Sequence, residues 1–525
     1  MITRPLSRGR ASCASNTRWG RIGLAAMAAS VALTVAVAAA GPSVMEPALP
    51  RRAGQPPWAF NAHPSPYLAA GLTAAALGIG VLGLVLTLRA IRGGWSVPAR
   101  AVLVGGLLAA AVLTLVPPLG SSDQLSYAAY GRMLVTGHNP YTTTPAQLAA
   151  LGDPVARAVE DWFTMPSVYG PLATGVQGLA SLTGGTSVRL TVFVLGLADL
   201  TAFAITALLL HHMTRGDPVR QLRAALLWAA NPLLLQVLIC GAHVDAQAVV
   251  FGVAAVAVMY GPWAAPRASV PSLTRSTLAG VLVGLGFAVK VSDVLVGLGL
   301  AMTLVLGLRS GQRRLLPSLA GLGAGFAATA GAAIAIGGPA MLGQLSRESN
   351  LVSIASPWRV IRTLVHLAVG GAAATDMVKA GAIALAVLLA VLLIRGLPGP
   401  GETVVFAVVL AWLFAWPYVL PWYDALAWAL LPLIPWGAAA ADGICWLLLA
   451  RTTALAFGYL PARQADATLP SGLSWLQPAI RHGVTLAILT AAAVWLAVLM
   501  LRARWTGRLA PEGITGVQLT ATKAP

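Results

Sequence analysis

The sequence predicts an all-α polytopic membrane protein, a chain that crosses a bilayer many times as helices. Of its 525 residues, 58% are hydrophobic and only 10% are charged, and the mean hydropathy is +0.79. A soluble globular protein is usually about 25% charged. A helix needs about 20 apolar residues to cross a hydrocarbon core of about 30 Å. Runs close to that length recur from one end of the chain to the other.

Fourteen apolar runs, each ended by charge, proline or glycine, are the candidate transmembrane helices. They lie near residues 22–41, 67–88, 100–117, 188–211, 222–240, 245–261, 274–289, 291–308, 314–337, 376–395, 402–420, 424–438, 441–460 and 480–501. The first run resembles a secretory signal, but its length favours a retained anchor. The chain then divides into a cytoplasmic tail (1–21), N-terminal transmembrane helices (22–99), a central core (100–440) with an outer loop (118–187), C-terminal transmembrane helices (441–501) and a second cytoplasmic tail (502–525).

Residues 167–183 form a further stretch that is moderately apolar but interrupted by glycine and proline. If this stretch crossed the membrane, the cluster of Arg215, Arg220 and Arg223 would lie on the opposite side from the arginine-rich N-terminus. That arrangement contradicts the tendency of basic loops to stay in the cytoplasm. We therefore expect a re-entrant or interfacial helix here, with both chain termini in the cytoplasm.

Cysteine content and charge exclude several classes of function. The chain has three cysteines, too few for a disulfide framework, a thiolate zinc site or an iron–sulfur cluster. The formal net charge of +18 would suggest nucleic acid in a soluble protein. Here the arginines fall in short loops between apolar runs, where they set the orientation in the membrane. We therefore expect no nucleic-acid partner.

The longest outer segment, residues 117–166, combines several chemical types of side chain. Asp123 follows the third run, where a carboxylate can stay ionised and still face a headgroup, which suits a general base. Tyr127 and Tyr130 would share one helix face, where their rings pack against sugar or lipid or form an aromatic belt. His138 stands in an Asn-Pro turn, either as a donor to a ligand or simply solvated.

Two further breaks on the outer side carry polar and charged groups. In the segment 241–245, a glycine hinge would let His243 and Asp245 converge. They would act as an acid with its orienting carboxylate or as ligands of sugar hydroxyls, although Asp245 also suits an ordinary helix N-cap. Lys290 ends another run, where its ammonium would either bind a lipid phosphate as a point charge or snorkel to the interface.

The remaining polar candidates lie in two outer segments near residues 338–371 and 416–424. Arg359 and Arg362 would either hold one phosphate together or form salt bridges within their loop. Trp422 and Tyr423 belong to an aromatic, proline-broken turn that would line a lipid or sugar groove or form an aromatic belt.

Three acidic residues are expected to have ordinary structural surroundings. Glu160 and Asp161 precede a tryptophan and a proline turn, and we expect this pair on a solvated surface. Asp199 falls inside the fourth run, where a buried carboxyl is costly unless it is hydrogen-bonded. We therefore expect a structural hydrogen bond at Asp199.

In their order and common placement, these motifs resemble those of the GT-C glycosyltransferases, polytopic membrane enzymes that use polyprenyl-phosphate sugars as donors. More narrowly, the chain is similar to the bacterial polyprenol-phosphate-mannose-dependent α-1,6-mannosyltransferases that elongate the mannan core of lipomannan. The similarity covers roughly residues 100–440 and rests on Asp123 with Tyr127 and Tyr130, residues 137–141, 166–172, 231–234 and 241–245, Trp416 to Tyr418, and Pro421 to Tyr423.

The resemblance implies a GT-C-like catalytic core at residues 100–440. Asp123 would be the base that deprotonates an acceptor mannose hydroxyl, with Lys290 at the departing lipid phosphate and Arg359 or Arg362 as a further candidate there. Inverting attack on a β-linked donor would give an α-linked product. Substrate contacts would come from Tyr127, Tyr130, His138, Tyr169, His243, Asp245, Trp422 and Tyr423. Val244 stands where such proteins commonly have asparagine, which leaves the role of that position open.

The resemblance also implies the partners. Polyprenyl-phosphate mannose would be the donor and a mannan or lipoglycan the acceptor, at the outer face of a bacterial plasma membrane. No metal or cofactor is expected, because the phosphate leaves as an anion and the outer loop has no Asp-x-Asp pair. The alternative function is a transporter or a flippase of lipid-linked saccharides, which should carry internal repeats and a polar path near the bilayer midplane.

Overall fold

The computed structural model describes residues 7–50, 52–262, 270–397, 399, 401–435, 439–464 and 468–505. All the regular secondary structure of these residues is helical, so the predicted all-α class is confirmed for the described part of the chain. The two predicted cytoplasmic tails fall partly outside it, because residues 1–6 and 506–525 are not described.

Eight helical stretches among the described residues are long and apolar enough to cross a membrane: Ser15–Ala40, Pro66–Arg92, Val188–Met213, Pro218–Cys240, Val291–Arg309, Arg313–Glu348, Gly371–Gly396 and Ser471–Arg502. Shorter apolar helices accompany them at Ala99–Thr114, Asp245–Tyr260, Leu273–Val289 and Gly401–Ala415. These stretches coincide with all but two of the predicted runs. A membrane protein with many helices is therefore confirmed, while the number of fourteen crossings stays a prediction.

The other two predicted runs are not among these stretches, and one of them is not a single helix. The run near 424–438 is divided into short turns, which are η6 (Pro421–Asp424), α17 (Ala425–Leu430) and η7 (Leu431–Leu433). Prolines at positions 421 and 432 interrupt the ladder of helical hydrogen bonds there. The run near 441–460 corresponds to a single helix, α18 (Ala439–Phe457).

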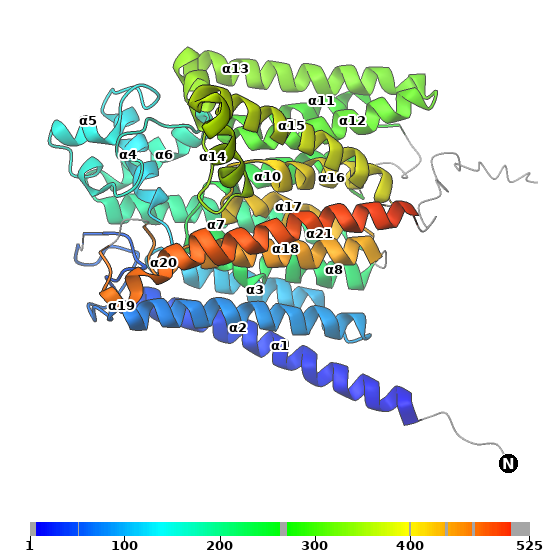
Figure 1. Ribbon diagram of the computed structural model, residues 1–525, viewed down its shortest axis with the longest axis horizontal. Helices are drawn as coiled ribbons and strands as arrows, with labels where there is room; N and C mark the ends of the chain where they lie inside the picture. The colour runs from blue at the N-terminus through cyan, green and yellow to red at the C-terminus, as the bar shows by residue number, and fades with distance from the viewer. Residues whose placement is uncertain are drawn as a thin grey trace, which may run out of the picture.

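The long helices run side by side in one bundle (Figure 1). Together with α18, they are α1 (Ser7–Ala40), α2 (Pro66–Arg92), α3 (Ala99–Thr114), α7 (Val188–Met213), α10 (Asp245–Tyr260), α11 (Leu273–Val289), α12 (Val294–Arg309), α13 (Leu316–Glu348), α15 (Gly371–Gly396), α16 (Gly401–Ala415) and α21 (Thr485–Trp505). Helix α1 packs along α2, α11 packs along α13, and α16 contacts both α12 and α15.

Three shorter helices gather at one end of the bundle: α4 (Asp123–Val135), α5 (Pro145–Ala150) and α6 (Pro171–Gly184) (Figure 1). The beginning of α1, the end of α21 and α8 (Pro218–Ala224) lie at the opposite end. Helix α6 has 14 residues, whereas a spanning helix needs about 20. This length agrees with the re-entrant or interfacial helix expected within residues 167–183.

The helical stretch before His243 is interrupted twice. Helix α8 continues as the π-helical turn η2 (Ala225–Ala229), restarts as α9 (Pro232–Leu234) and ends in a second π-helical turn, η3 (Leu235–Cys240). The side chain of Asn231 caps α9 by accepting a hydrogen bond from the N–H of Leu233. Ala242 then adopts a positive φ of 49°. Such π-helical turns frequently occur at functional sites.

The other described helices are short or lie at the surface. They are η1 (Ala156–Ala158), η4 (Val291–Asp293), η5 (Arg313–Leu315), α14 (Pro357–Val369), α19 (Ser471–Ser474), α20 (Leu476–Pro478) and η8 (Ala479–Val484). Helix α14 has no buried residue, and it crosses the direction of the long helices in Figure 1. Its exposed apolar side chains, such as Leu364 and Leu367, make it an amphipathic surface helix.

Several charged groups inside the bundle have polar partners. The Asp199 carboxylate accepts a hydrogen bond from Nε2 of Gln247 at 2.8 Å, which confirms the structural hydrogen bond expected for Asp199. Nε of Arg451 lies 2.9 Å from the Asp424 carboxylate, which also accepts a hydrogen bond from the Thr452 hydroxyl. These pairs allow polar side chains to be buried within the apolar bundle.

Candidate active site

Asp123 begins α4, at the end of the bundle where α4, α5 and α6 gather (Figure 1). Its Oδ1 atom accepts a hydrogen bond from the indole Nε1 of Trp162 at 3.2 Å. Its Oδ2 atom lies 3.8 Å from Nε2 of His243, and the Asp123 side chain is 13% exposed. The carboxylate is therefore oriented by the Trp162 indole, which comes from a distant part of the chain, while a small part of it stays accessible.

The surroundings of Asp123 favour its protonated form. Burial raises the pKa of Asp123 to about 7, and the nearby carboxylate of Asp161 adds to the increase. The hydrogen bond from Trp162 and the positive charge of Lys290 lower the pKa of Asp123 and offset part of that increase. A general base works best when its pKa lies near the working pH. The electrostatics thus suit Asp123 to proton abstraction.

His243 is held in one orientation and one tautomer. Its Nδ1 lies 2.6 Å from the backbone carbonyl of Val237, and because a carbonyl only accepts, Nδ1 carries the proton. The imidazole stacks on the indole of Trp422 with ring centroids 3.5 Å apart. Burial lowers the pKa of His243 to about 3, so the ring stays neutral. Its Nε2 faces Asp123 as a hydrogen-bond acceptor.

Lys290 forms a buried ion pair with Asp245. The Lys290 ammonium lies 2.8 and 2.9 Å from the two Asp245 carboxylate oxygens, and it stands 4.0 Å from the ring centre of Tyr423. The Tyr423 hydroxyl donates a hydrogen bond to Glu348 at 3.2 Å. The charge of Lys290 is therefore compensated by a carboxylate, and a phosphate would have to share or replace that partner.

A cavity of about 540 Å³ opens beside Asp123. Its lining is dominated by aromatic rings and consists of Asp123, Ser126, Tyr127, Tyr130, Trp162, Met165, Pro166, Val168, Tyr169, Glu348, Leu351, Tyr418, Leu420, Trp422 and Tyr423. Rings of this kind offer apolar faces to a ligand, and their hydroxyl or N–H groups offer hydrogen bonds. We refer to this space as the Asp123 cavity. It joins a carboxylate to aromatic surfaces on which a ligand can pack.

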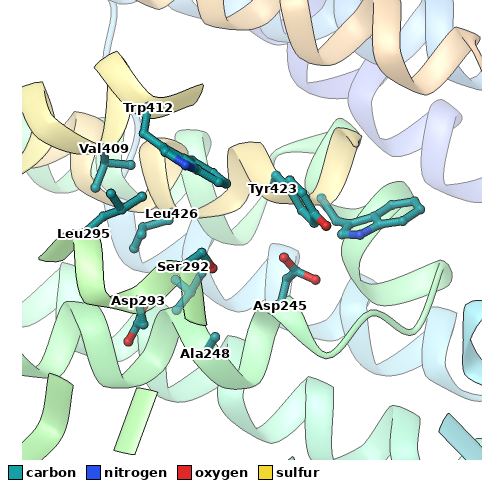
Figure 2. A pocket seen from close by; sticks show the side chains of 11 residues that line it. Asp245, Ala248, Ser292, Asp293, Leu295, Val409, Trp412, Tyr423 and Leu426 are labelled. Carbon is teal, nitrogen blue, oxygen red and sulfur yellow. The ribbon is translucent and has the colours of Figure 1, made fainter. Parts of the chain in front are cut away.

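A second pocket, of about 350 Å³, adjoins the Asp123 cavity at Trp422 and Tyr423. Figure 2 shows Asp245, Ser292 and Asp293 on its lower side and Trp412 and Tyr423 above them. This pocket lies among α10, α12, α16 and η6, so it is set deeper in the bundle than the Asp123 cavity. The aromatic turn at Trp422 and Tyr423 forms the wall between the two spaces.

The structure brings together most of the site residues predicted from the sequence. Six of them line the Asp123 cavity: Asp123, Tyr127, Tyr130, Tyr169, Trp422 and Tyr423. His243 and Lys290 contact these residues, and Asp245 pairs with Lys290. Residues far apart in the sequence therefore meet at one end of the bundle, as the motifs predicted.

Three predicted site residues lie elsewhere. His138 does not line the Asp123 cavity, and its Nδ1 lies 3.1 Å from the Thr136 hydroxyl. Arg359 and Arg362 are on α14, where Arg359 is exposed and Arg362 is half-buried. Neither arginine lines the cavity. Their predicted contacts with substrate or phosphate remain predictions that this geometry does not support directly.

Sequence reasoning missed Trp162 and Glu348, which line the Asp123 cavity, whereas Tyr418, also in the lining, belongs to the aromatic turn that was predicted to line a groove. The expectation of a solvated acidic pair at residues 160 and 161 is wrong. Glu160 forms an ion pair with Arg463 at 2.7 Å, and Asp161 accepts a hydrogen bond from the Ser122 hydroxyl at 2.5 Å. These partners come from other segments of the chain. The only local feature that could have indicated a place near the site was the tryptophan beside the acidic pair.

Comparisons with known proteins address the function. Residues 21–306, more than half of the chain, match the family described as α-(1→6)-mannopyranosyltransferase, N-terminal domain. An α-(1→6)-mannopyranosyltransferase B from Corynebacterium glutamicum is 26% identical over 76% of this chain and 67% of its own length. An α-(1→6)-mannopyranosyltransferase from Mycobacterium tuberculosis is 32% identical over 26% of this chain and 23% of its own length.

Among solved structures, an oligosaccharyltransferase from Archaeoglobus fulgidus, in complex with an inhibitory peptide and a dolichol-phosphate, matches 77% of this chain and 56% of its own. The sequence identity is 14% and the TM-score is 0.35.

An all-helical membrane fold with a buried carboxylate beside an aromatic cavity, together with these sequence matches, defines a membrane glycosyltransferase. The chain belongs to the α-(1→6)-mannopyranosyltransferase family. Of the two functions that the sequence predicted, family membership favours the enzyme over the transporter or flippase.

Proposed function

We propose that this enzyme transfers mannose from polyprenyl-phosphate mannose to a mannan or lipoglycan acceptor, forming an α-1,6 linkage at the outer face of a bacterial plasma membrane. The observation that carries the proposal is the Asp123 carboxylate, whose pKa is about 7, beside an aromatic cavity of about 540 Å³. Helix α4, which begins with Asp123, lies at the bundle end opposite the beginning of α1 in Figure 1, and arginine-rich N-termini stay in the cytoplasm.

In the proposed reaction Asp123 accepts the proton of the acceptor's primary hydroxyl. The resulting oxygen nucleophile attacks the anomeric carbon of the donor mannose, and the bond between that carbon and the phosphate oxygen breaks. The electron pair leaves with the polyprenyl phosphate, and a β-linked donor gives an α-linked product. The leaving group is already an anion, so we propose that the reaction needs no metal.

The polyprenyl tail would lie against the lipid-facing helices, with its phosphate near Lys290. Because Asp245 already compensates that charge, we propose that Lys290 turns from the carboxylate toward the donor phosphate when the donor binds. Arg359 and Arg362 on α14 would attract the anionic headgroup from the lipid surface.

The decisive variant is Asp123→Asn, which keeps the shape of the side chain and removes the base. General-base catalysis contributes about 10²- to 10⁴-fold to the rate, so we expect the rate of transfer to decrease by about that factor. Membranes with the wild-type or variant enzyme would be incubated with radiolabelled polyprenyl-phosphate mannose and an oligomannoside.

The matched control is Asp153→Asn, a carboxylate in the same outer loop that pairs with Arg132 and does not line the Asp123 cavity. It should retain transfer while it is folded. Normal transfer by the Asp123→Asn variant would disprove the base assignment. No transfer by the wild-type enzyme would disprove the choice of donor or acceptor.

A further inference from the structure

Trp162 differs from the other aromatic residues of the Asp123 cavity in its exposure. Its side chain is 39% exposed, and every other residue that lines the cavity is buried or half-buried. Tyr127 and Tyr130 are 2% and 3% exposed. Trp162 therefore stands at the mouth of the cavity, where a ligand from the outer medium would arrive first.

Most of the other rings already have partners. Tyr127 packs edge-on against Tyr169 with centroids 5.1 Å apart, Trp422 stacks on His243, and Tyr423 lies under the ammonium of Lys290. Within the part of the chain that the structure describes, no ring stacks on Trp162. An indole face is thus available at the cavity mouth.

The loop that carries Trp162 is fixed on both sides. The Asp161 carboxylate accepts a hydrogen bond from the Ser122 hydroxyl, and the backbone carbonyl of Asp161 accepts one from the Ser126 hydroxyl. The backbone carbonyl of Met165 accepts one from the Tyr130 hydroxyl. Trp162 itself adopts a φ of 62°, in the left-handed region that a bulky side chain rarely occupies. Strained residues held by surrounding contacts cluster at active sites and ligand clamps.

We propose that the exposed indole face of Trp162 is the platform on which the acceptor pyranose stacks, with its reacting hydroxyl toward Asp123. The C–H groups on one face of a pyranose are apolar and pack on an aromatic ring, while its hydroxyls point outward. The indole N–H already reaches Asp123 at 3.2 Å, so a sugar on this ring lies beside the base. The assignment rests on the proposed function, because it presumes a sugar acceptor.

The test separates the ring face from the N–H group with two variants. Trp162→Leu removes both, and we expect the acceptor KM to rise about tenfold while the donor KM stays unchanged. Trp162→Phe keeps an aromatic face and removes the N–H, so the acceptor KM should change far less. The loss of the hydrogen bond to Asp123 should move the acidic limb of the pH profile of the Phe variant upward.

Phe163→Leu is the matched control. Phe163 neighbours Trp162 and is 37% exposed, but it does not line the Asp123 cavity, so both KM values should stay at the wild-type level. An unchanged acceptor KM in Trp162→Leu, or equal increases in Trp162→Leu and Trp162→Phe, would overturn the platform while transfer itself remained established. A wild-type enzyme that transfers no mannose would overturn the proposed function and the platform together.

A second measurement uses the wild-type protein and does not depend on the folding of a variant. N-bromosuccinimide oxidises exposed tryptophans, and mass spectrometry of peptides identifies each site. An oligomannoside should slow the oxidation of Trp162 and leave that of Trp58, which is 52% exposed, unchanged. Equal oxidation of Trp162 with and without the oligomannoside would overturn the platform.

Discussion

The Asp123 carboxylate lies where burial and a second carboxylate oppose its ionisation, while an indole N–H and an ammonium favour it. The balance leaves a group that changes charge near neutral pH. A free aspartate has a pKa of about 3.9 and is too weak a base to withdraw a proton effectively from an alcohol. The higher pKa of Asp123 makes it a stronger base, and it also limits the fraction that is ionised.

That balance predicts an acidic limb in the pH profile of transfer. Only ionised Asp123 accepts a proton, so activity should fall as the pH drops through about 7 and should level off above it. The measurement is kcat/KM for the acceptor between pH 5 and pH 9, and one ionisation should describe the decrease.

Replacement of Asp161 tests one cause of the raised pKa of Asp123. The negative charge of Asp161 raises the pKa of Asp123, so Asp161→Asn should move the acidic limb to lower pH. The amide oxygen of asparagine can still accept the hydrogen bond that Ser122 donates to residue 161. A limb that stayed in place would show that burial alone sets the pKa of Asp123.

The pair of Lys290 and Asp245 predicts a difference between single and double variants. Removal of one partner of a buried pair leaves an uncompensated charge and costs about 3–5 kcal/mol. Lys290→Met should therefore lower the thermal unfolding midpoint more than Lys290→Met combined with Asp245→Leu. Unfolding of the purified enzyme in detergent would measure both, and equal midpoints would contradict a structural role for the pair.

For single residues, the sequence predicted site residues where a polar side chain stands at the end of an apolar run. Asp123, His243 and Lys290 were predicted because each charge or imidazole interrupts an apolar run. The contacts among them were not predictable, since Lys290 meets Asp245 across 45 positions of the chain. Trp162 was missed because only the fold brings it within hydrogen-bond distance of Asp123, 39 positions away in the chain.

Among the helices, close packing of α4 on α6 positions the base. Gly131 of α4 lies so near α6 that a Cβ atom there would stand 2.1 Å from the carbonyl oxygen of Gln177. That contact is with backbone, which cannot rotate away as a side chain can. Glycine at position 131 therefore lets the helix that begins at Asp123 lie directly on α6.

Gly131→Ala should displace α4 and reduce transfer, although residue 131 does not line the Asp123 cavity. Overpacking of this kind costs about 1–3 kcal/mol. The control is Gly175→Ala in α6, where a Cβ atom would meet nothing within 4 Å. The control should retain full transfer, because alanine is the better helix former. Equal activity of the two variants in the radiolabel assay would contradict the role of this contact.

The positions of most helices could be predicted because the length of an apolar run has a simple physical meaning in a bilayer. Helix interruptions were harder to predict. The run near 424–438 is apolar throughout most of its length, yet prolines divide it into short helical segments. The π-helical turns before His243 have no comparable signal in the sequence.

For the whole molecule, the two ends of the bundle should face different compartments. A cysteine at Thr164, in the exposed loop beside Trp162, should react with an impermeant thiol reagent added outside intact cells. A cysteine at Ser310, between α12 and α13, should react only after the membrane is opened. Both would be made after Cys13 is replaced by serine. Labelling of both sites from outside would contradict the proposed orientation.

In the proposed reaction, each transfer would leave Asp123 carrying the proton taken from the acceptor, and the next cycle would need that proton removed. His243 is a poor temporary holder, because its pKa is about 3 and its Nδ1 is committed to the carbonyl of Val237. In the proposed reaction the proton would therefore pass to the water at the mouth of the Asp123 cavity, where Trp162 is exposed. Acidification of that water would slow the loss of the proton between turnovers, so the rate of the proposed transfer would decrease as the surrounding medium became more acidic.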